Sequence, residues 1–366
     1  MIKTTPFEMV FIIRDCMNNT SASLSVQKKV PFLELLRIIA SFCVIVNHTA
    51  PDVFLASAPS AGWFASVFYF FASKIAVPVF LMISGYTLLD KQDDWKKAFL
   101  RFFRIGCTLV FFSAVYFIAY YLNGDFERFS IVSFFGWILP GPITNAYWYL
   151  YLYLGLLLMM PFLQKLASVL KKEDFHIFFL CSGVLYSFWP IVVHYIPKLS
   201  YCAYFSAPLF FGEISLLMLG CYLKRYSVTS KKRQMFAAGG FLFCCILNVV
   251  LTYFEYQRNG GTDYLFLDYY LHLPIILESV CAFYFVSTLS LKEKGAKRIA
   301  FLGSLTFGIY LMSDLLNKHL KPVFIGLSEL TGSALLSLLP YELLIFILGG
   351  VIAWILKKIP VIKKLL

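Results

Sequence analysis

The stretch FLELLRIIASFCVIVNH, residues 32–48, decides the fold, because it is an apolar helix with an arginine toward one end and a histidine toward the other. Arg37 and His48 are eleven positions apart, which at 100° per residue is three turns plus about 20°. They therefore share one face, roughly 16 Å apart along the axis, with Ser41 as the polar residue between them. A titratable side chain in hydrocarbon is costly unless it faces a polar cavity. Both ends are therefore candidate functional positions.

The composition places this helix in a membrane. Apolar residues make up 60% of the 366 residues and charged residues 14%, whereas soluble domains average about 25% charged. The mean hydropathy is +0.76. Repeated apolar runs of about 20 residues predict an all-α polytopic membrane protein. The net charge of +12 then indicates a basic cytoplasmic face, and we expect no nucleic-acid partner. The nine cysteines form no CxxC or CxxxC pair, so we expect neither a disulfide frame nor a metal site.

Hydropathy predicts about ten transmembrane helices. The outer loop 123–146 contains an apolar piece that is too short to span the membrane, so we expect it to be interfacial or re-entrant. The expected helices are 31–49, 64–89, 97–122, 147–166, 174–196, 203–223, 234–254, 269–291, 299–319 and 334–357.

Loop charge predicts the orientation. Twenty-three lysines and arginines fall in the segments on the side of the termini, and five fall on the other side. The positive-inside rule therefore places both termini in the cytoplasm. We expect a disordered cytoplasmic tail over 1–30, the membrane domain over 31–357 and a basic tail over 358–366. The five lysines and arginines on the outer side are Arg128, Lys198, Arg258, Lys318 and Lys321.

Two further arginines lie at the predicted depth of Arg37. Arg101 and Arg104 are three positions apart, so they share a face in the cytoplasmic half of the third helix. Because guanidinium forks suit phosphate oxygens, one interpretation is a phosphate site that opens to the cytoplasm. In the other interpretation Arg101 and Arg104 extend to lipid headgroups, while Arg37 pairs with Glu34 one turn away.

An ordered set of motifs resembles acyltransferase family 3, the integral-membrane acyltransferases of bacterial surface glycans. The motifs are ELLRIIASFCVIVNH (Arg-x10-His), AVPVFLMISGY, RFFR (Arg-x-x-Arg), WYLYLYLGLLLMMP and SLTFGIYL. They occur in order with suitable gaps over about residues 31–357. Each motif alone is a weak signal, whereas the ordered set is fairly specific.

The resemblance implies an enzyme of the bacterial plasma (inner) membrane. Its donor would be acyl-coenzyme A, typically acetyl-CoA, and its acceptor a hydroxyl of a surface or lipid-linked glycan, with no permanently bound cofactor. Arg37, Arg101 and Arg104 would hold the nucleotide phosphates, with Ser41 along the path of the pantetheine arm. His48 would take the proton of the acceptor hydroxyl as it attacks the thioester, a role that suits an imidazole.

Other polar and aromatic residues are candidates for substrate binding. Ser84 and Tyr86 follow Pro78 and would shape the cavity, unless Gly85 simply allows close helix packing. Trp148 and Tyr149 match the family motif, although such residues also anchor helices at the membrane interface. The in-span acids Glu213, Glu278 and Asp314 would line the acceptor site or pair with Lys74. We expect structural roles for the three outer histidines, His194, His272 and His319.

Two positions depart from the family pattern. Ala146 and Ser313 stand where members often have histidine, which puts the acceptor site or a second proton relay in doubt, though not the donor site. Asp314 follows Ser313, and His319 lies near enough to compensate. Some members carry a fused extracytoplasmic esterase-like domain. The last predicted helix of this chain lies only a few residues before its end, so we expect it to act alone or to hand the acyl group to a separate extracytoplasmic protein.

The sequence thus predicts a membrane O-acyltransferase, most simply an O-acetyltransferase. One alternative is a transporter or flippase for a lipid-linked glycan, although no inverted repeat of the Arg/His helix is evident. Another is an inactive relative with a role in assembly, motivated by Ala146 and Ser313.

Overall fold

The structure is a computed structural model, and it describes residues 30–126, 129–199, 211–262 and 264–366. These residues form helices and connecting segments, and no strand occurs among them. Within the same ranges nine helical stretches are long and apolar enough to cross a membrane. The all-α polytopic membrane fold is therefore confirmed. The tail predicted over 1–30 lies almost entirely outside the described residues.

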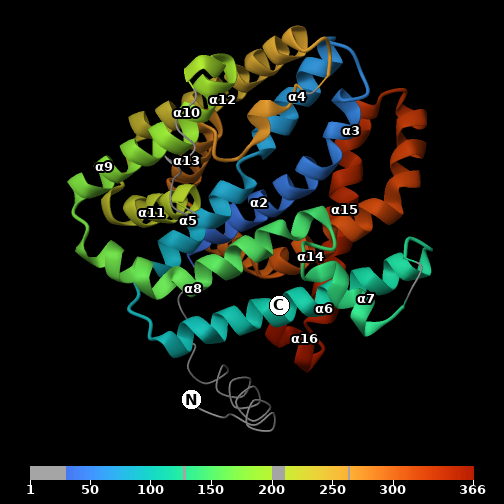
Figure 1. Cartoon of the computed structure of the whole chain (residues 1–366), viewed down its shortest axis with the longest axis horizontal. Coiled ribbons are helices and arrows are strands. Elements are labelled where there is room, and N and C mark those ends of the chain that lie inside the picture. Colours follow the sequence, from blue (N-terminus) through green and yellow to red (C-terminus); the bar gives the residue numbers. More distant parts are fainter. Residues whose placement is uncertain (1–29, 127–128, 200–210, 263) are drawn as a thin grey trace.

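The bundle is built around the helix that carries Arg37 and His48. This helix, α2 (Pro31–Thr49), contacts α4, α5, α13, α14 and α15, and Figure 1 shows it crossing the middle of the molecule. Pairs of other helices pack side by side, namely α5 on α11, α6 on α8, α12 on α13 and α14 on α15. The remaining bounds are α3 (Pro51–Phe54), α4 (Ala61–Ser73), α5 (Ala76–Leu88), α6 (Trp95–Leu122), α7 (Ile131–Ile138), η1 (Asn145–Tyr147), α8 (Trp148–Val169), α9 (Lys172–Ser182), η2 (Gly183–Phe188), α10 (Trp189–Tyr195), η3 (Pro197–Leu199), α11 (Phe211–Tyr226), α12 (Lys231–Arg258), η4 (Phe266–Asp268), α13 (Leu273–Ser287), α14 (Glu293–Thr331), α15 (Ala334–Leu356) and α16 (Pro360–Leu365).

The second predicted span is bent. The sequence predicts one helix over 64–89, whereas α4 ends at Ser73 and α5 begins at Ala76. Pro78 accounts for the bend, because it has no N–H to donate to the carbonyl of Lys74 and its ring crowds that carbonyl. The bend opens the span at Lys74, in the middle of the predicted membrane segment.

Other boundaries also differ from prediction. The helix expected to end at 319 continues as α14 to Thr331, through Pro322, and Gly332 ends it with a φ of +66°. The span expected over 174–196 contains a π-helical segment, Gly183–Phe188. The apolar piece of the outer loop forms only the eight-residue α7, too short to span, as expected. Part of the helix predicted over 203–223 lies outside the described residues, so the total of ten spans stays a prediction.

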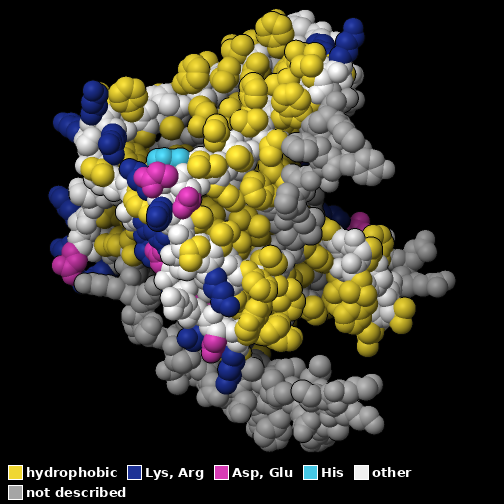
Figure 2. Space-filling model, turned by 60° about the vertical axis from the view of Figure 1, so that its left-hand side comes forward, with side chains coloured by type: hydrophobic (Ala, Val, Ile, Leu, Met, Phe, Trp, Pro, Cys, Tyr) yellow, Lys and Arg dark blue, Asp and Glu magenta, His cyan; other side chains and the backbone are white. Residues whose placement is uncertain are grey.

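The surface has the composition of a protein in lipid. Large apolar side chains such as Phe103, Phe236, Phe243 and Leu336 are more than half exposed. Figure 2 shows hydrophobic side chains over most of one face, with lysine and arginine gathered mainly toward one side. A soluble protein rarely exposes apolar patches of such extent, so this surface faces lipid. The orientation of the termini stays a prediction.

Candidate active site

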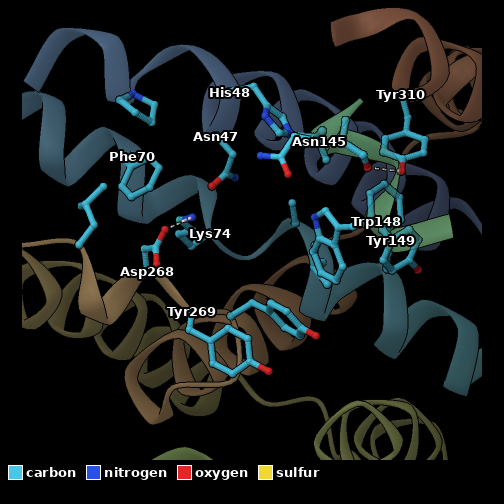
Figure 3. A pocket seen from close by; sticks show the side chains of 18 residues that line it. Asn47, His48, Phe70, Lys74, Asn145, Trp148, Tyr149, Asp268, Tyr269 and Tyr310 are labelled. Atoms are coloured by element: carbon cyan, nitrogen blue, oxygen red, sulfur yellow. Dashed lines mark hydrogen bonds and ion pairs between the residues drawn. The ribbon is translucent and has the colours of Figure 1, made fainter. Parts of the chain in front are cut away.

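A cavity of about 550 Å³ lies beside the last turn of α2. Its volume falls within the roughly 300–1,000 Å³ of small-molecule sites. Helix α2, the bend between α4 and α5, the start of α8, the loop before α13 and one tyrosine of α14 form its wall (Figure 3). The lining residues are Val44, Asn47, His48, Pro51, Phe70, Lys74, Ala76, Val77, Phe80, Asn145, Ala146, Trp148, Tyr149, Leu265, Asp268, Tyr269, Tyr270 and Tyr310.

His48 presents its imidazole to this cavity. The residue is half-buried, and the amide of Asn317 donates to its backbone oxygen at 3.4 Å. Within the described part of the chain no side chain hydrogen-bonds the imidazole itself. Asp314 and Lys74 are the charged side chains that act on the ring electrostatically. Both ring nitrogens therefore have hydrogen-bonding capacity left for a ligand.

The bend in the second span brings a cation to the same cavity. Lys74 is largely buried, its ammonium lies 3.3 Å from a carboxylate oxygen of Asp268, and it sits 4.3 Å from the ring centroid of Phe70. Of the two alternatives predicted for Glu213, Glu278 and Asp314, the pairing with Lys74 is therefore wrong, because Asp268 takes that place. Asp268 lies in the short 3-10 segment before α13, where no helical period indicated it.

Asn47 ties the bend to the helix that carries His48. Its amide nitrogen donates to the backbone oxygens of Cys43 and Ser73, each at 2.8 Å. Ser73 is the last residue of α4, so this contact joins α2 to the bend. Asn47 therefore links the last turn of α2, which carries His48, to the break that precedes Lys74.

Aromatic rings form the opposite wall. Trp148 stacks on Tyr270 with ring centroids 5.2 Å apart and planes 28° apart, and Tyr149 stacks on Tyr153 at 5.8 Å. Trp148 and Tyr149 were predicted as substrate-binding residues, and the structure places both in the wall with His48. Glu213, predicted for the same role, lies behind this wall and accepts a hydrogen bond of 2.6 Å from Tyr270.

Hydrogen bonds fasten the start of α8 to α14. The hydroxyl of Tyr310 donates to the backbone oxygen of Ala146 at 2.6 Å, and that of Tyr147 donates to Leu311 at 2.7 Å. The hydroxyl of Thr144 donates to the carboxylate of Asp314. Asp314 therefore lies behind the cavity wall, near His48 but outside the lining.

The three arginines lie apart from the cavity, and none of them lines it. Arg37 pairs with Glu34, as one of the two interpretations anticipated, and Arg101 pairs with Asp93 at 2.6 Å. Arg104 is exposed and has no acidic partner within the described residues. For a phosphate, the three arginines thus offer one guanidinium without a carboxylate partner and two that already hold carboxylates, and their convergence on one site stays a prediction.

Asp93 belongs to the loop before α6, outside the spans. Burial alone would raise the pKa of its carboxyl, but hydrogen bonds from Arg101 and Gln164 outweigh burial and hold that pKa below its ordinary value. The Arg101 pair is therefore a firm part of the folded loop.

The remaining predicted site residues serve packing contacts. Ser41 is fully buried and donates to the backbone oxygen of Thr306 at 3.2 Å. Ser84 donates to Phe80 at 3.0 Å, and Tyr86 packs edge-on against Phe32. None of the three lines the cavity, so their binding roles stay predictions without support from this geometry.

Glu342 of α15 is a buried carboxylate that sequence reasoning missed. It is fully buried and accepts hydrogen bonds from Thr49, at 2.6 Å, and from Tyr69. Thr49 follows His48 directly, so this carboxylate fixes the end of α2. The signal was available, since Glu342 is an acid inside an apolar span.

Comparison with known proteins identifies the family. A family model described as an acyltransferase domain, that of acyltransferase family 3, matches residues 30–358. The chain belongs to acyltransferase family 3. The match covers all the predicted membrane domain, 31–357. No curated protein and no solved structure matches the chain significantly.

The two departures from the usual family 3 pattern occupy different surroundings. Ala146 lines the cavity close to His48, whereas Ser313 is buried and donates to the backbone of Tyr310 at 3.0 Å. His319 does not line the cavity. Its ring contacts Asn123 at 3.1 Å and the backbone of Leu315 at 2.8 Å. In this family member His48 is thus the one histidine among the described lining residues.

The other outer histidines are engaged by protein groups. His194 pairs with Glu255 at 2.9 Å and stacks on Phe266, while His272 is buried beside the same ring. These contacts agree with structural roles for both residues. Glu278 is fully buried between α12 and α13, where the amide of Asn248 approaches it at 3.4 Å.

Proposed function

We propose that this family 3 acyltransferase moves an acyl group, most simply acetyl, from cytoplasmic acyl-CoA to a hydroxyl of a surface or lipid-linked glycan in the bacterial inner membrane. The observation that carries the proposal is the imidazole of His48. It has no protein hydrogen-bond partner in the described chain, and it faces a cavity walled by aromatic rings and amides. A general base requires an accessible ring nitrogen of this kind.

The reaction needs one base at the acceptor hydroxyl. A ring nitrogen of His48 takes the hydroxyl proton while the oxygen attacks the thioester carbonyl, so that a C–O bond forms and the C–S bond breaks. The imidazolium then returns the proton to the departing thiolate. The products are the glycan ester and free coenzyme A, and His48 ends in its starting form. No other residue of the enzyme gains or loses a proton or a covalent bond in this step.

The donor half of the proposal rests on the arginines of the predicted cytoplasmic side. Arg104 is open to a phosphate, whereas Arg37 and Arg101 would exchange Glu34 and Asp93 for phosphate oxygens. Phosphate oxygens make the same kind of charge-assisted contact to Arg as carboxylate oxygens do, so the exchange conserves the number of such contacts. The pantetheine arm then covers the roughly 16 Å between Arg37 and His48.

An assay in sealed vesicles tests the proposal. Labelled acetyl-CoA is enclosed, and extracted surface glycan of the host is supplied outside. We expect label on the glycan with the native protein and none with His48→Ala, while calorimetry shows unchanged affinity for coenzyme A. Glycan movement without label would instead support a flippase. Label that persists with His48→Ala would overturn the base assignment.

A second experiment tests the donor site. Arg104→Ala should weaken coenzyme A binding by about tenfold or more, the value of one lost charge-assisted contact. Lys165→Ala, which removes an exposed cation on the same predicted side, is the matched control and should leave binding unchanged. Equal effects of both variants would show that general charge attraction, not a site, holds the carrier. Mass spectrometry of surface glycans with and without the protein would identify the acyl group and its position.

A further inference from the structure

The charged groups of the cavity form a loose pair. Among the described lining residues, Lys74 and Asp268 carry the formal charges, one of each sign. Their 3.3 Å separation exceeds the roughly 2.7–2.9 Å of a tight charge-assisted contact. An ammonium has three donors, and within the described chain Asp268 is its hydrogen-bond partner. Donors of Lys74 and acceptor positions of Asp268 therefore remain open to a ligand.

Two carboxyl groups lie just behind the wall, and the cation of Lys318 lies close to one of them, Asp314. Glu213 lies behind Tyr270, and Asp314 lies behind the start of α8. No lysine or arginine other than Lys74 lines the cavity within the described residues. A ligand that carried a negative charge would meet Asp268 with only one cation to offset it. Because Lys74 and Asp268 balance each other within the lining, a neutral ligand suits the cavity better than an anion does.

The uncharged part of the wall suits a sugar. Asn145 and His48 line the cavity with the pair, and the rings of Trp148, Tyr269 and Tyr270 supply flat apolar faces (Figure 3). Few polar groups set among aromatic rings are the usual makeup of a small-molecule site. Vicinal hydroxyls can accept from an ammonium and donate to a carboxylate at the same time.

From these contacts we infer that the Lys74–Asp268 pair selects the acceptor, holding a neutral sugar by its hydroxyls and rejecting an acidic one. The inference rests on the proposed function, since it names the substrate class of that same cavity. The pair acts by charge balance. Removing the carboxylate alone leaves an uncompensated cation, and removing both charged groups restores neutrality.

Saturation-transfer NMR on protein in nanodiscs tests this without any acyl-CoA. The probes are the methyl glycosides of glucose, galactose and N-acetylglucosamine, and the methyl glycosides of glucuronic and galacturonic acid. The native protein should bind at least one neutral glycoside about tenfold better than any uronic acid, since a uronate would place a second carboxylate beside Asp268. Asp268→Asn should reverse this order, and the double variant Lys74→Gln with Asp268→Asn should restore it at lower affinity.

The matched control is Asp125→Asn, which removes the carboxylate of another lysine–aspartate pair, with Lys318, outside the cavity. It should leave the order unchanged, and thermal unfolding should show all variants folded. Three outcomes would overturn the inference: equal binding of neutral and acidic probes, a preference that Asp268→Asn leaves unchanged, or no sugar binding at all. If sugar binding follows the expected order but vesicle transfer fails, the proposed function is wrong instead.

Discussion

The side-chain amide of Asn47 donates to the backbone oxygen of Ser73 across 2.8 Å, and this contact joins the helix of His48 to the bend that carries Lys74. Ser73 is the last residue of α4, so its backbone oxygen lies at the break between α4 and α5. One amide thus satisfies a carbonyl at the break and links the helix of His48 to the segment that carries Lys74.

Asn47→Ala should lower the free energy of unfolding by about 1–3 kcal/mol, because a buried carbonyl loses its donor. Thermal unfolding in nanodiscs measures the change. The control is Asn123→Ala, which removes an exposed amide that contacts His319. Equal stability of the two variants would mean that water satisfies the bend.

Glu342→Ala should cost about 2–5 kcal/mol, since the hydroxyls of Thr49 and Tyr69 lose their shared acceptor in a buried place. Glu342→Gln should cost less, because its amide keeps one acceptor oxygen. Chemical unfolding of both variants measures the difference, and the exposed change Glu329→Gln is the control. A Glu342→Gln variant that is less stable than the Glu342→Ala variant would contradict this account.

Gly85→Ala and Gly220→Ala should each destabilise the protein by about 1–3 kcal/mol or more, because the added methyl groups overpack the contact between α5 and α11. A Cβ at Gly85 would lie 1.8 Å from the backbone oxygen of Leu217, and one at Gly220 would lie 1.9 Å from that of Met82. Gly239→Ala, where a Cβ meets open space, should be neutral or stabilising. Thermal midpoints compare the three.

The Arg101–Asp93 pair should make stability fall in acid. The pKa of Asp93 is lower in the folded protein than its ordinary value near 3.8. The pair therefore contributes fully above that ordinary value, and the contribution is lost as pH falls through the folded pKa. The destabilisation by Asp93→Asn should accordingly be present at pH 6 and shrink below pH 3.8, as thermal midpoints across pH would show. A pH-independent difference would contradict the linkage.

Hydropathy and helical periodicity predicted the architecture, because the apolar composition of each membrane span is visible within its own stretch of sequence. They missed the bend at Lys74, although Pro78 was visible, because a proline inside a span shows that a carbonyl is freed but not what satisfies it. They also ended the ninth span at 319, whereas α14 continues to Thr331. The added residues include Pro322, and neighbouring packing overrides its local preference.

Sequence reasoning predicted some of the residues that line the cavity and missed others. Helical spacing placed His48, and the family motif placed Trp148 and Tyr149 with it. Asp268 and Asn145 lie in segments without a regular period, so no spacing rule predicted that they meet Lys74 and His48. The pairing of Arg37 with Glu34 was one of the two predicted alternatives, since these residues are three positions apart on one helix.

The length of α14 offers a direct way to establish which side of the protein faces out. Its 39 residues extend about 58 Å at 1.5 Å per residue, nearly twice the thickness of about 30 Å of hydrocarbon. If the part of α14 before Pro322 spans the lipid, the hairpin of α14 with α15 projects beyond it, with Gly332 exposed at the tip. An epitope tag inserted after Gly332 would thus be read by antibody on intact spheroplasts if the loop charges orient the chain as expected.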